Sequence, residues 1–226
     1  MGPSRTEALL RAQDSACALF SDVEARGLIR AGVSESELSR EIRALAHEQY
    51  GVGRHWHKRI VRSGPNTLQP YAENPPDRVL GRDEIVFLDL GPVFAEWEAD
   101  FGRTYVLGHD PDKLRLRDDL AVAFAAGRAH FDEHPDITGA ELFTFVQNDA
   151  VERGWTYGGP IAGHLVGDFP HQRVSGDKVL SYIAPGNDRP LRSTDRRGNA
   201  RHWILEIHLV DRAREIGGFY EQLLTA

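Results

Sequence analysis

Two aspartates lie eleven residues apart, on either side of a predicted break in an extended segment. Asp89 lies near the end of the apolar run 84–90, Gly91 and Pro92 interrupt that run, and Asp100 follows on a second extended stretch. Carboxylates on neighbouring strands can face one point, where a cation relieves their mutual repulsion. Taken alone, each aspartate could equally well stabilise a turn or lie on the solvent-exposed surface.

A histidine and two glutamates further along the chain could complete such a site. His164 is flanked by small residues that allow close approach of the backbone, and His171 follows seven positions later. Glu206 interrupts an apolar strand pattern, where an unpaired buried carboxylate is costly. Glu221 lies near the C-terminus. Exposed loop histidines and solvent-facing acids are the alternatives for each residue taken singly.

The segment His55-Trp56-His57 carries another pair of histidines. Alternate residues of an extended segment point to the same side, so both rings could line a substrate pocket. Partial exposure to solvent and a separate metal site are the alternatives.

The hydrophobic pattern predicts the elements that must position these residues. Apolar residues at helical spacing indicate two helices within residues 1–50, and Ser34 with Glu37 forms a capping-box pattern at the start of the second. Thr138 and Glu141 form another. Helices are expected over 111–130 and 138–153, strands over 59–61, 84–90, 103–107, 179–183, 203–210 and 219–224, and a long loop over 184–200.

The predicted order is two helices, strands, two helices and strands, which indicates an α+β fold built from two similar halves. No linker or low-complexity stretch divides the chain, so residues 1–226 are expected to form one domain. The N-terminal helices would occupy about 1–50, and the region with the candidate ligands about 59–226.

Composition narrows the classes of partner. The formal net charge is -7, and a net negative protein is not attracted to the phosphates of nucleic acid, so no nucleic-acid partner is expected. The single cysteine excludes a disulfide within the chain and a cysteine-based zinc site. The sequence has neither an apolar run long enough to cross a membrane nor a signal-peptide pattern, so no membrane association and a cytoplasmic location are expected.

The order Asp, Asp, His, Glu, Glu resembles that of the pita-bread metallopeptidase superfamily, which includes aminopeptidase P, prolidase, methionine aminopeptidase and creatinase. The resemblance covers about residue 59 to the C-terminus. It is carried by Ile60-Val61-Arg62-Ser63-Gly64-Pro65-Asn66, Phe87-Leu88-Asp89-Leu90-Gly91, Asp100-Phe101-Gly102-Arg103-Thr104, Gly163-His164 with His171, and Phe219-Tyr220-Glu221.

The resemblance implies a pseudo-twofold αα-β-αα-β fold with a curved antiparallel sheet. It also implies a dinuclear hydrolase whose two divalent ions (Mn, Fe, Co or Zn) activate a bridging water to cleave a C–N bond of a peptide or small substrate. The implied ligands are Asp89, Asp100, His164, Glu206 and Glu221, with His171 contacting the substrate. Arg103 and Thr104 would support Asp100 and its neighbours.

The sequence departs from the family pattern near the expected substrate pocket. Tyr71 occupies the place of a histidine that usually follows the Ser-Gly-Pro-Asn turn, and Tyr71 is therefore a second catalytic candidate. A phenol is a poor proton carrier near neutral pH. The alternatives are a creatinase-like C–N hydrolase or a metal-dependent lyase acting on a specialised small molecule, and an inactive peptide-binding module. A homodimer is a further expectation.

Overall fold

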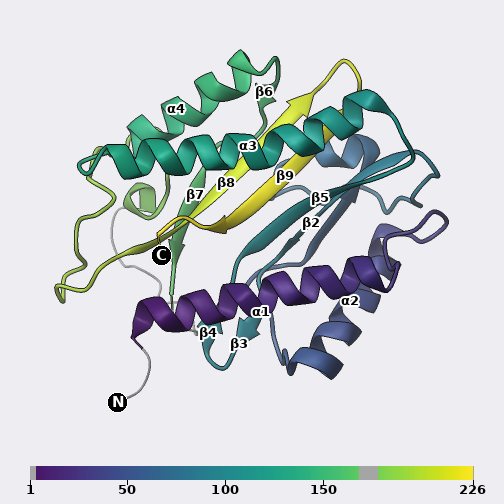
Figure 1. Ribbon diagram of the computed structural model, residues 1–226, viewed down its shortest axis with the longest axis horizontal. Coiled ribbons are helices and arrows are strands. Elements are labelled where there is room, and N and C mark those ends of the chain that lie inside the picture. The colour runs from purple at the N-terminus through teal and green to yellow at the C-terminus, as the bar shows by residue number, and fades with distance from the viewer. Residues whose placement is uncertain (1–3, 168–177, 226) are drawn as a thin grey trace.

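The computed structural model describes residues 4–167 and 178–225, in which four long helices pack on an antiparallel sheet (Figure 1). The first helix pair is α1 (Arg5–Ala25) and α2 (Glu35–Tyr50). Ser4 and Glu7 form a capping box on α1, and the Ser34 side chain accepts a hydrogen bond from the Glu37 backbone N–H at the start of α2. These bonds satisfy amide groups that have no partner within the helix.

The second helix pair repeats this arrangement. Helix α3 (Pro111–Glu133) begins at Asp110, and α4 (Gly139–Glu152) begins with the predicted capping box of Thr138 and Glu141. Figure 1 shows α1 and α2 along the lower side of the view and α3 and α4 along the upper side, as a half-turn rotation would relate them. The predicted pseudo-twofold order of helices is confirmed.

One antiparallel sheet runs through both halves. Its strand order is β1-β2-β5-β9-β8-β6, and β7 pairs with β8. The bounds are β1 (Ile60–Ser63), β2 (Glu84–Leu90), β5 (Phe101–Leu107), β6 (Thr156–Tyr157), β7 (Gly163–Val166), β8 (His202–Asp211) and β9 (Ile216–Leu223), while β3 (Val93–Phe94) and β4 (Trp97–Glu98) form a separate hairpin. Strands β5 and β9 join the two halves at the centre of the sheet.

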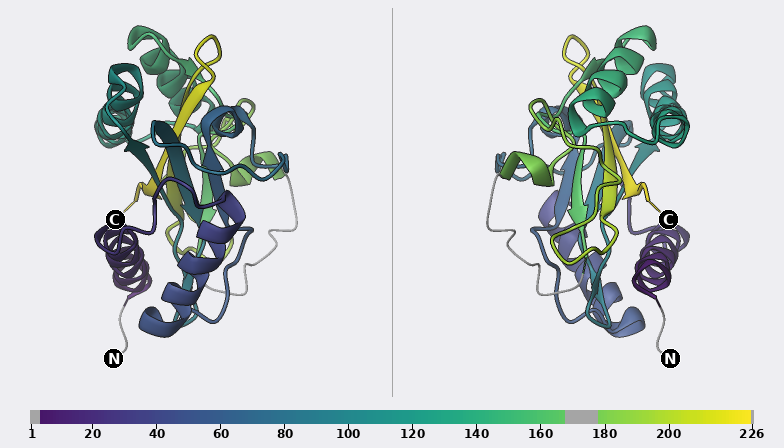
Figure 2. Two further views of the ribbon diagram at one scale, coloured as in Figure 1. Left: turned by 90° about the vertical axis from the view of Figure 1, so that its right-hand side faces the viewer. Right: turned by 90° about the vertical axis from the view of Figure 1, so that its left-hand side faces the viewer.

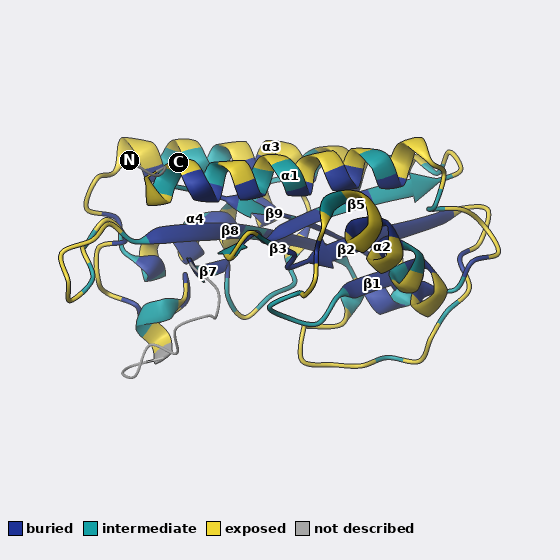
Figure 3. Cartoon of the chain, turned by 90° about the horizontal axis from the view of Figure 1, so that it is seen from below, coloured by how far each residue is buried: buried dark blue, intermediate teal, exposed yellow. Residues whose placement is uncertain are grey.

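Each helix pair covers its half of the sheet with its own apolar core, as the twisted layers in Figure 2 and the buried inner faces in Figure 3 show. Leu38 and Ile42 of α2 pack with Leu88 in the first core. Leu120 of α3 and Leu205 of β8 belong to the second. The strands that carry Asp89, Glu206 and Glu221 are therefore each backed by a helix pair, on either side of the contact between β5 and β9.

The strand expected over 179–183 is wrong. Residues Lys178–Ser181 form the 3-10 helix η2, and the Tyr182 N–H donates to the carbonyl of Val179 at 3.1 Å. Tyr182 forms an isolated antiparallel bridge with His164, and the Ile183 N–H donates to the Gly163 carbonyl at 2.8 Å. A local i to i+3 bond thus satisfies the backbone of this short apolar run instead of a strand ladder.

None of the helices within residues 4–167 and 178–225 combines the length and the apolar character that a membrane span requires.

Candidate metal centre

A row of directly paired residues crosses the sheet at the predicted site. Asp89 of β2 pairs with Gly102 of β5, Gly102 pairs with Glu221 of β9, and Glu221 pairs with Glu206 of β8. Directly opposed residues of antiparallel strands project to the same face, so three carboxylates converge there. A Cβ on Gly102 would lie 2.6 Å from the Phe219 ring, so this position requires glycine.

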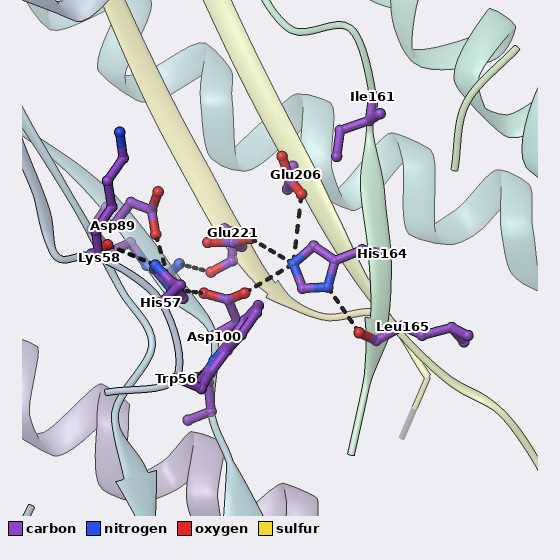
Figure 4. Close-up of polar contacts among 12 residues, drawn as sticks. Trp56, His57, Lys58, Asp89, Asp100, Ile161, His164, Leu165, Glu206 and Glu221 are labelled. Carbon is purple, nitrogen blue, oxygen red and sulfur yellow. Dashed lines mark hydrogen bonds and ion pairs between the residues drawn. The ribbon is translucent and has the colours of Figure 1, made fainter. Parts of the chain in front are cut away.

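Asp100 and His164 enter the same space from outside this row. Asp100 lies between β4 and β5, is buried, and follows the tight hairpin that reverses the chain after β2. His164 lies on β7, which pairs with the ligand strand β8. The His164 Nε2 atom is 2.9 Å from Asp100 Oδ2 and 3.7 Å from both Glu206 Oε1 and Glu221 Oε1 (Figure 4).

The structure therefore brings together all five residues that the resemblance assigns as ligands. The sequence did not predict that His57 would join them. Its Nε2 atom is 3.0 Å from Asp100 Oδ1 and 3.5 Å from Asp89 Oδ1, and its side chain is 7% exposed. Figure 4 shows the two imidazoles on opposite sides of Asp100.

Burial and mutual repulsion raise the pKa of three of the carboxyls. Burial raises the pKa of Asp89 to about 7 and that of Glu206 to about 8. Burial, together with the charges of Asp100 and Asp89, raises the pKa of Glu221 well above its usual value. These acids resist ionisation because burial removes the water that would stabilise their charge, and because neighbouring carboxylates repel it.

The pKa values of the two imidazoles are also raised, because the neighbouring carboxylates stabilise the charged rings. Burial disfavours the charged form of His57, but Asp100 and Asp89 outweigh it and raise the pKa to about 9. The pKa of His164 also rises well above its usual value, mainly through its hydrogen bonds to Asp100 and Glu221 against the cost of burial. In return, His57 and His164 hold the pKa of the buried Asp100 below its usual range.

The donor set fits divalent metal ions. Two groups of three residues present ligand atoms within 4.8 Å of one another: His57, Asp89 and Asp100, and then Asp100, His164 and Glu221. Asp100 belongs to both, as a bridging carboxylate would. The Glu221 Oε2 atom is buried without a hydrogen-bond partner, which a cation would supply. Mixed oxygen and imidazole donors suit Mn, Fe, Co or Zn.

Arg103 and Thr104 support the neighbouring strand β9 more than Asp100 itself. The Arg103 guanidinium donates to the Glu221 carbonyl at 3.0 Å and also to the side chain of Gln222. The Thr104 hydroxyl donates to the Phe219 carbonyl at 2.9 Å and accepts from the Phe219 N–H at 2.7 Å. Both residues thus fix the strand that carries Glu221.

Tyr71 borders the cluster on a loop that is tied to the sheet. Its ring centroid lies 6.0 Å from that of His57, and the residue is 52% exposed. Lys58 Nζ donates to the Glu73 carbonyl at 3.1 Å, and Arg62 donates to the same carbonyl at 2.8 Å and to the carbonyl of Gln69. Burial of the phenol, with the charges of the nearby aspartates, raises the pKa of Tyr71.

The other two predicted substrate contacts have different positions. His55 is partly buried beside Pro92, and burial lowers its pKa to about 4. Its Nε2 atom is buried without a hydrogen-bond partner. His171 lies outside the described residues.

Comparisons with known proteins identify the family of this chain. A family model described as Metallopeptidase family M24 matches residues 7–195. A Xaa-Pro dipeptidase from Pyrococcus horikoshii is 27% identical over 150 residues, which are 65% of this chain and 42% of that protein. An uncharacterized peptidase, YqhT, from Bacillus subtilis is 26% identical over 146 residues, or 64% and 40% of the two chains. The chain spans less than half the length of these relatives.

Solved structures extend the likeness in fold to nearly the whole chain, beyond the residues that the family model matches. An X-Pro aminopeptidase from Thermotoga maritima matches with a TM-score of 0.74 at 20% identity, over 98% of this chain and 61% of that one. A prolidase from Pyrococcus horikoshii matches with a TM-score of 0.73 at 19% identity, over 98% and 59%. The predicted α+β pita-bread fold is thereby confirmed.

Proposed function

Because the chain belongs to metallopeptidase family M24, we propose that it is a metal-dependent hydrolase that cleaves a C–N bond of a peptide or small amide. The observation that carries the proposal is the convergence of four carboxylates and His164 from five separate segments on one largely buried space. Isolated buried charges are costly, so such a cluster needs counter-charges of its own.

We assign two divalent ions to this cluster. Asp89 would hold one, His164 and Glu206 the other, and Asp100 and Glu221 would bridge them. Bound there, the two ions would polarise the scissile carbonyl and lower the pKa of an attacking water. The chain's own residues must orient the substrate and handle its protons, and we assign these roles to His171 and Tyr71.

A short peptide is the first candidate substrate, because the Pyrococcus horikoshii relative is named a Xaa-Pro dipeptidase. A specialised small amide is the second, and Tyr71 is the observation that favours it. The exposed Tyr71 phenol can donate or accept a hydrogen bond, but its raised pKa makes it a weaker acid still near neutral pH. A single catalytic domain, a cytoplasmic location and a possible homodimer complete the proposal.

Metal content and substrate range test this function together. Elemental analysis after reconstitution should find about two ions per chain, and Asp100→Ala should lose tight binding of at least one. The reconstituted protein should hydrolyse a member of a panel of Xaa-Pro dipeptides, other dipeptides and small amides. Unchanged stoichiometry in Asp100→Ala would overturn the ligand assignment. Metal binding without turnover of any panel member would favour a lyase or a peptide-binding module.

A further inference from the structure

Two imidazoles flank Asp100 in the same way. His164 places its Nδ1 atom 2.9 Å from the carbonyl of Leu165, and His57 places its Nδ1 atom 2.7 Å from the carbonyl of Lys58. A carbonyl can only accept, so in each ring Nδ1 carries a proton, and loss of the second proton leaves an Nε2 lone pair directed at the carboxylates. This bond from Nδ1–H to an acceptor is typical of histidines that bind a metal.

The distances around His57 Nε2 are those between two ligands of one ion. Ligands about 2.1 Å from a metal are about 3.0 Å apart at a 90° angle and about 3.4 Å apart at a tetrahedral angle. The His57 Nε2 atom lies 3.0 Å from Asp100 Oδ1 and 3.5 Å from Asp89 Oδ1. His164 Nε2 has a corresponding separation of 2.9 Å from Asp100 Oδ2.

The chain around His57 is built to hold the ring in this position. The Trp56 N–H donates to the Gly91 carbonyl at 2.9 Å, and the Trp56 indole donates to the Ala99 carbonyl at 3.0 Å. The indole ring contacts both imidazoles edge-on, at centroid distances of 4.5 Å for His57 and 5.3 Å for His164. A Cβ on Gly91 would overlap the His57 ring, so glycine at that position leaves the space for it.

We propose that His57 binds, through Nε2, the ion held by Asp89 and Asp100, as a sixth protein ligand of the centre. The proposal rests on the proposed two-ion site and concerns a residue outside the five assigned ligands. Each ion would then have one imidazole, and Asp100 would offer one oxygen to each. A nitrogen donor at the first ion favours transition metals over Mg²⁺ and Ca²⁺, which prefer oxygen.

Proton NMR of the Co²⁺-substituted protein tests this ligand directly, without any activity. The Nδ1–H of a histidine bound to Co²⁺ gives an exchangeable signal that the paramagnetic ion shifts far outside the diamagnetic range. The wild-type protein with two Co²⁺ ions should show two such signals. His57→Gln and His164→Gln should each lose one, and His109→Ala, which alters an exposed histidine, should keep both.

Equilibrium dialysis with Co²⁺ alone supplies the second measurement. His57→Gln should weaken the binding of one Co²⁺ ion by about 10²-fold or more. This is the upper end of the effect known for groups that only support a ligand. Circular dichroism of the variant should match the wild type. Two bound ions with a single shifted signal in the wild type, or both signals kept in His57→Gln, would overturn His57 as a ligand and leave the proposed function standing. Failure of the wild-type protein to bind Co²⁺ would overturn both.

Discussion

Metal binding should displace protons from the centre, and the number can be worked out from the buried groups. At pH 7, a carboxyl with a pKa of about 7 is roughly half protonated and one with a pKa of about 8 roughly nine-tenths protonated. These are Asp89 and Glu206. His57, with a pKa of about 9, carries nearly a full proton. Loading both ions at pH 7 should therefore release at least roughly two protons, with more from Glu221 and His164, whose pKa values are also raised.

The apparent affinity for metal ions should rise with pH, because protons and metal ions compete for the same lone pairs. A release of two protons raises the product of the two binding constants by roughly 10²-fold per pH unit near pH 7. The slope should flatten above about pH 9, where His57 has lost its proton.

Isothermal titration calorimetry measures the release. Co²⁺ is titrated into metal-free protein in buffers with different ionisation enthalpies, and the observed heat is plotted against those enthalpies. The slope is the number of protons released. Glu206→Gln should lower that number by about one at pH 7, because this residue is then mostly protonated. A wild-type slope below one proton, or no change in the variant, would refute the electrostatic reasoning.

Four further outcomes are expected. The metal-free protein should lose stability to thermal unfolding as pH rises from about 6.5 to 9, because Glu206 and His57, whose pKa values are raised, favour the folded state only when protonated, and His55 and His208, whose pKa values are lowered to about 4, oppose this loss only at lower pH; saturation with metal should reverse the loss. Gly102→Ala should lower the free energy of unfolding in urea by about 1–3 kcal/mol through overpacking, whereas Gly53→Ala, with nothing within 4 Å, should not. Tyr71→Phe should lower kcat/KM for the true substrate, and Tyr71→His should raise peptide hydrolysis; the opposite ranking would contradict the assigned role. His171→Ala should keep its metal and turn over about 10²-fold more slowly, and a normal rate would make His171 a plain loop residue.

The sequence predicted the helices and the ligand-bearing strands because their signals are local. The capping box of Thr138 and Glu141 begins α4 as expected, and the apolar run of β2 ends beside Asp89 as expected. The run at 179–183 lacks such a signal. Its residues suit a short strand or a helical turn equally, and the structure has the helical turn, closed by the local bond from the Tyr182 N–H to the Val179 carbonyl.

The position of His57 could not be predicted from spacing. Alternation within His55-Trp56-His57 suggests that both rings share one environment, yet only His57 reaches the aspartates. The difference arises because the Trp56 backbone and indole are bonded to Gly91 and Ala99, which belong to a segment more than thirty residues away. A sequence pattern shows which side chains share a face, and tertiary hydrogen bonds decide how deeply each one enters the site.

The two-halved architecture accounts for the position of the centre. Each half of the chain packs its own helix pair on its own strands, and β5 meets β9 through the pair Gly102 and Glu221. A site at this joint receives Asp89, Asp100 and His57 from the first half. It receives His164, Glu206 and Glu221 from the second half, and these three residues complete the cluster. Relative movement of the halves would separate these ligands, so bound ions should hold them together and stabilise the whole sheet.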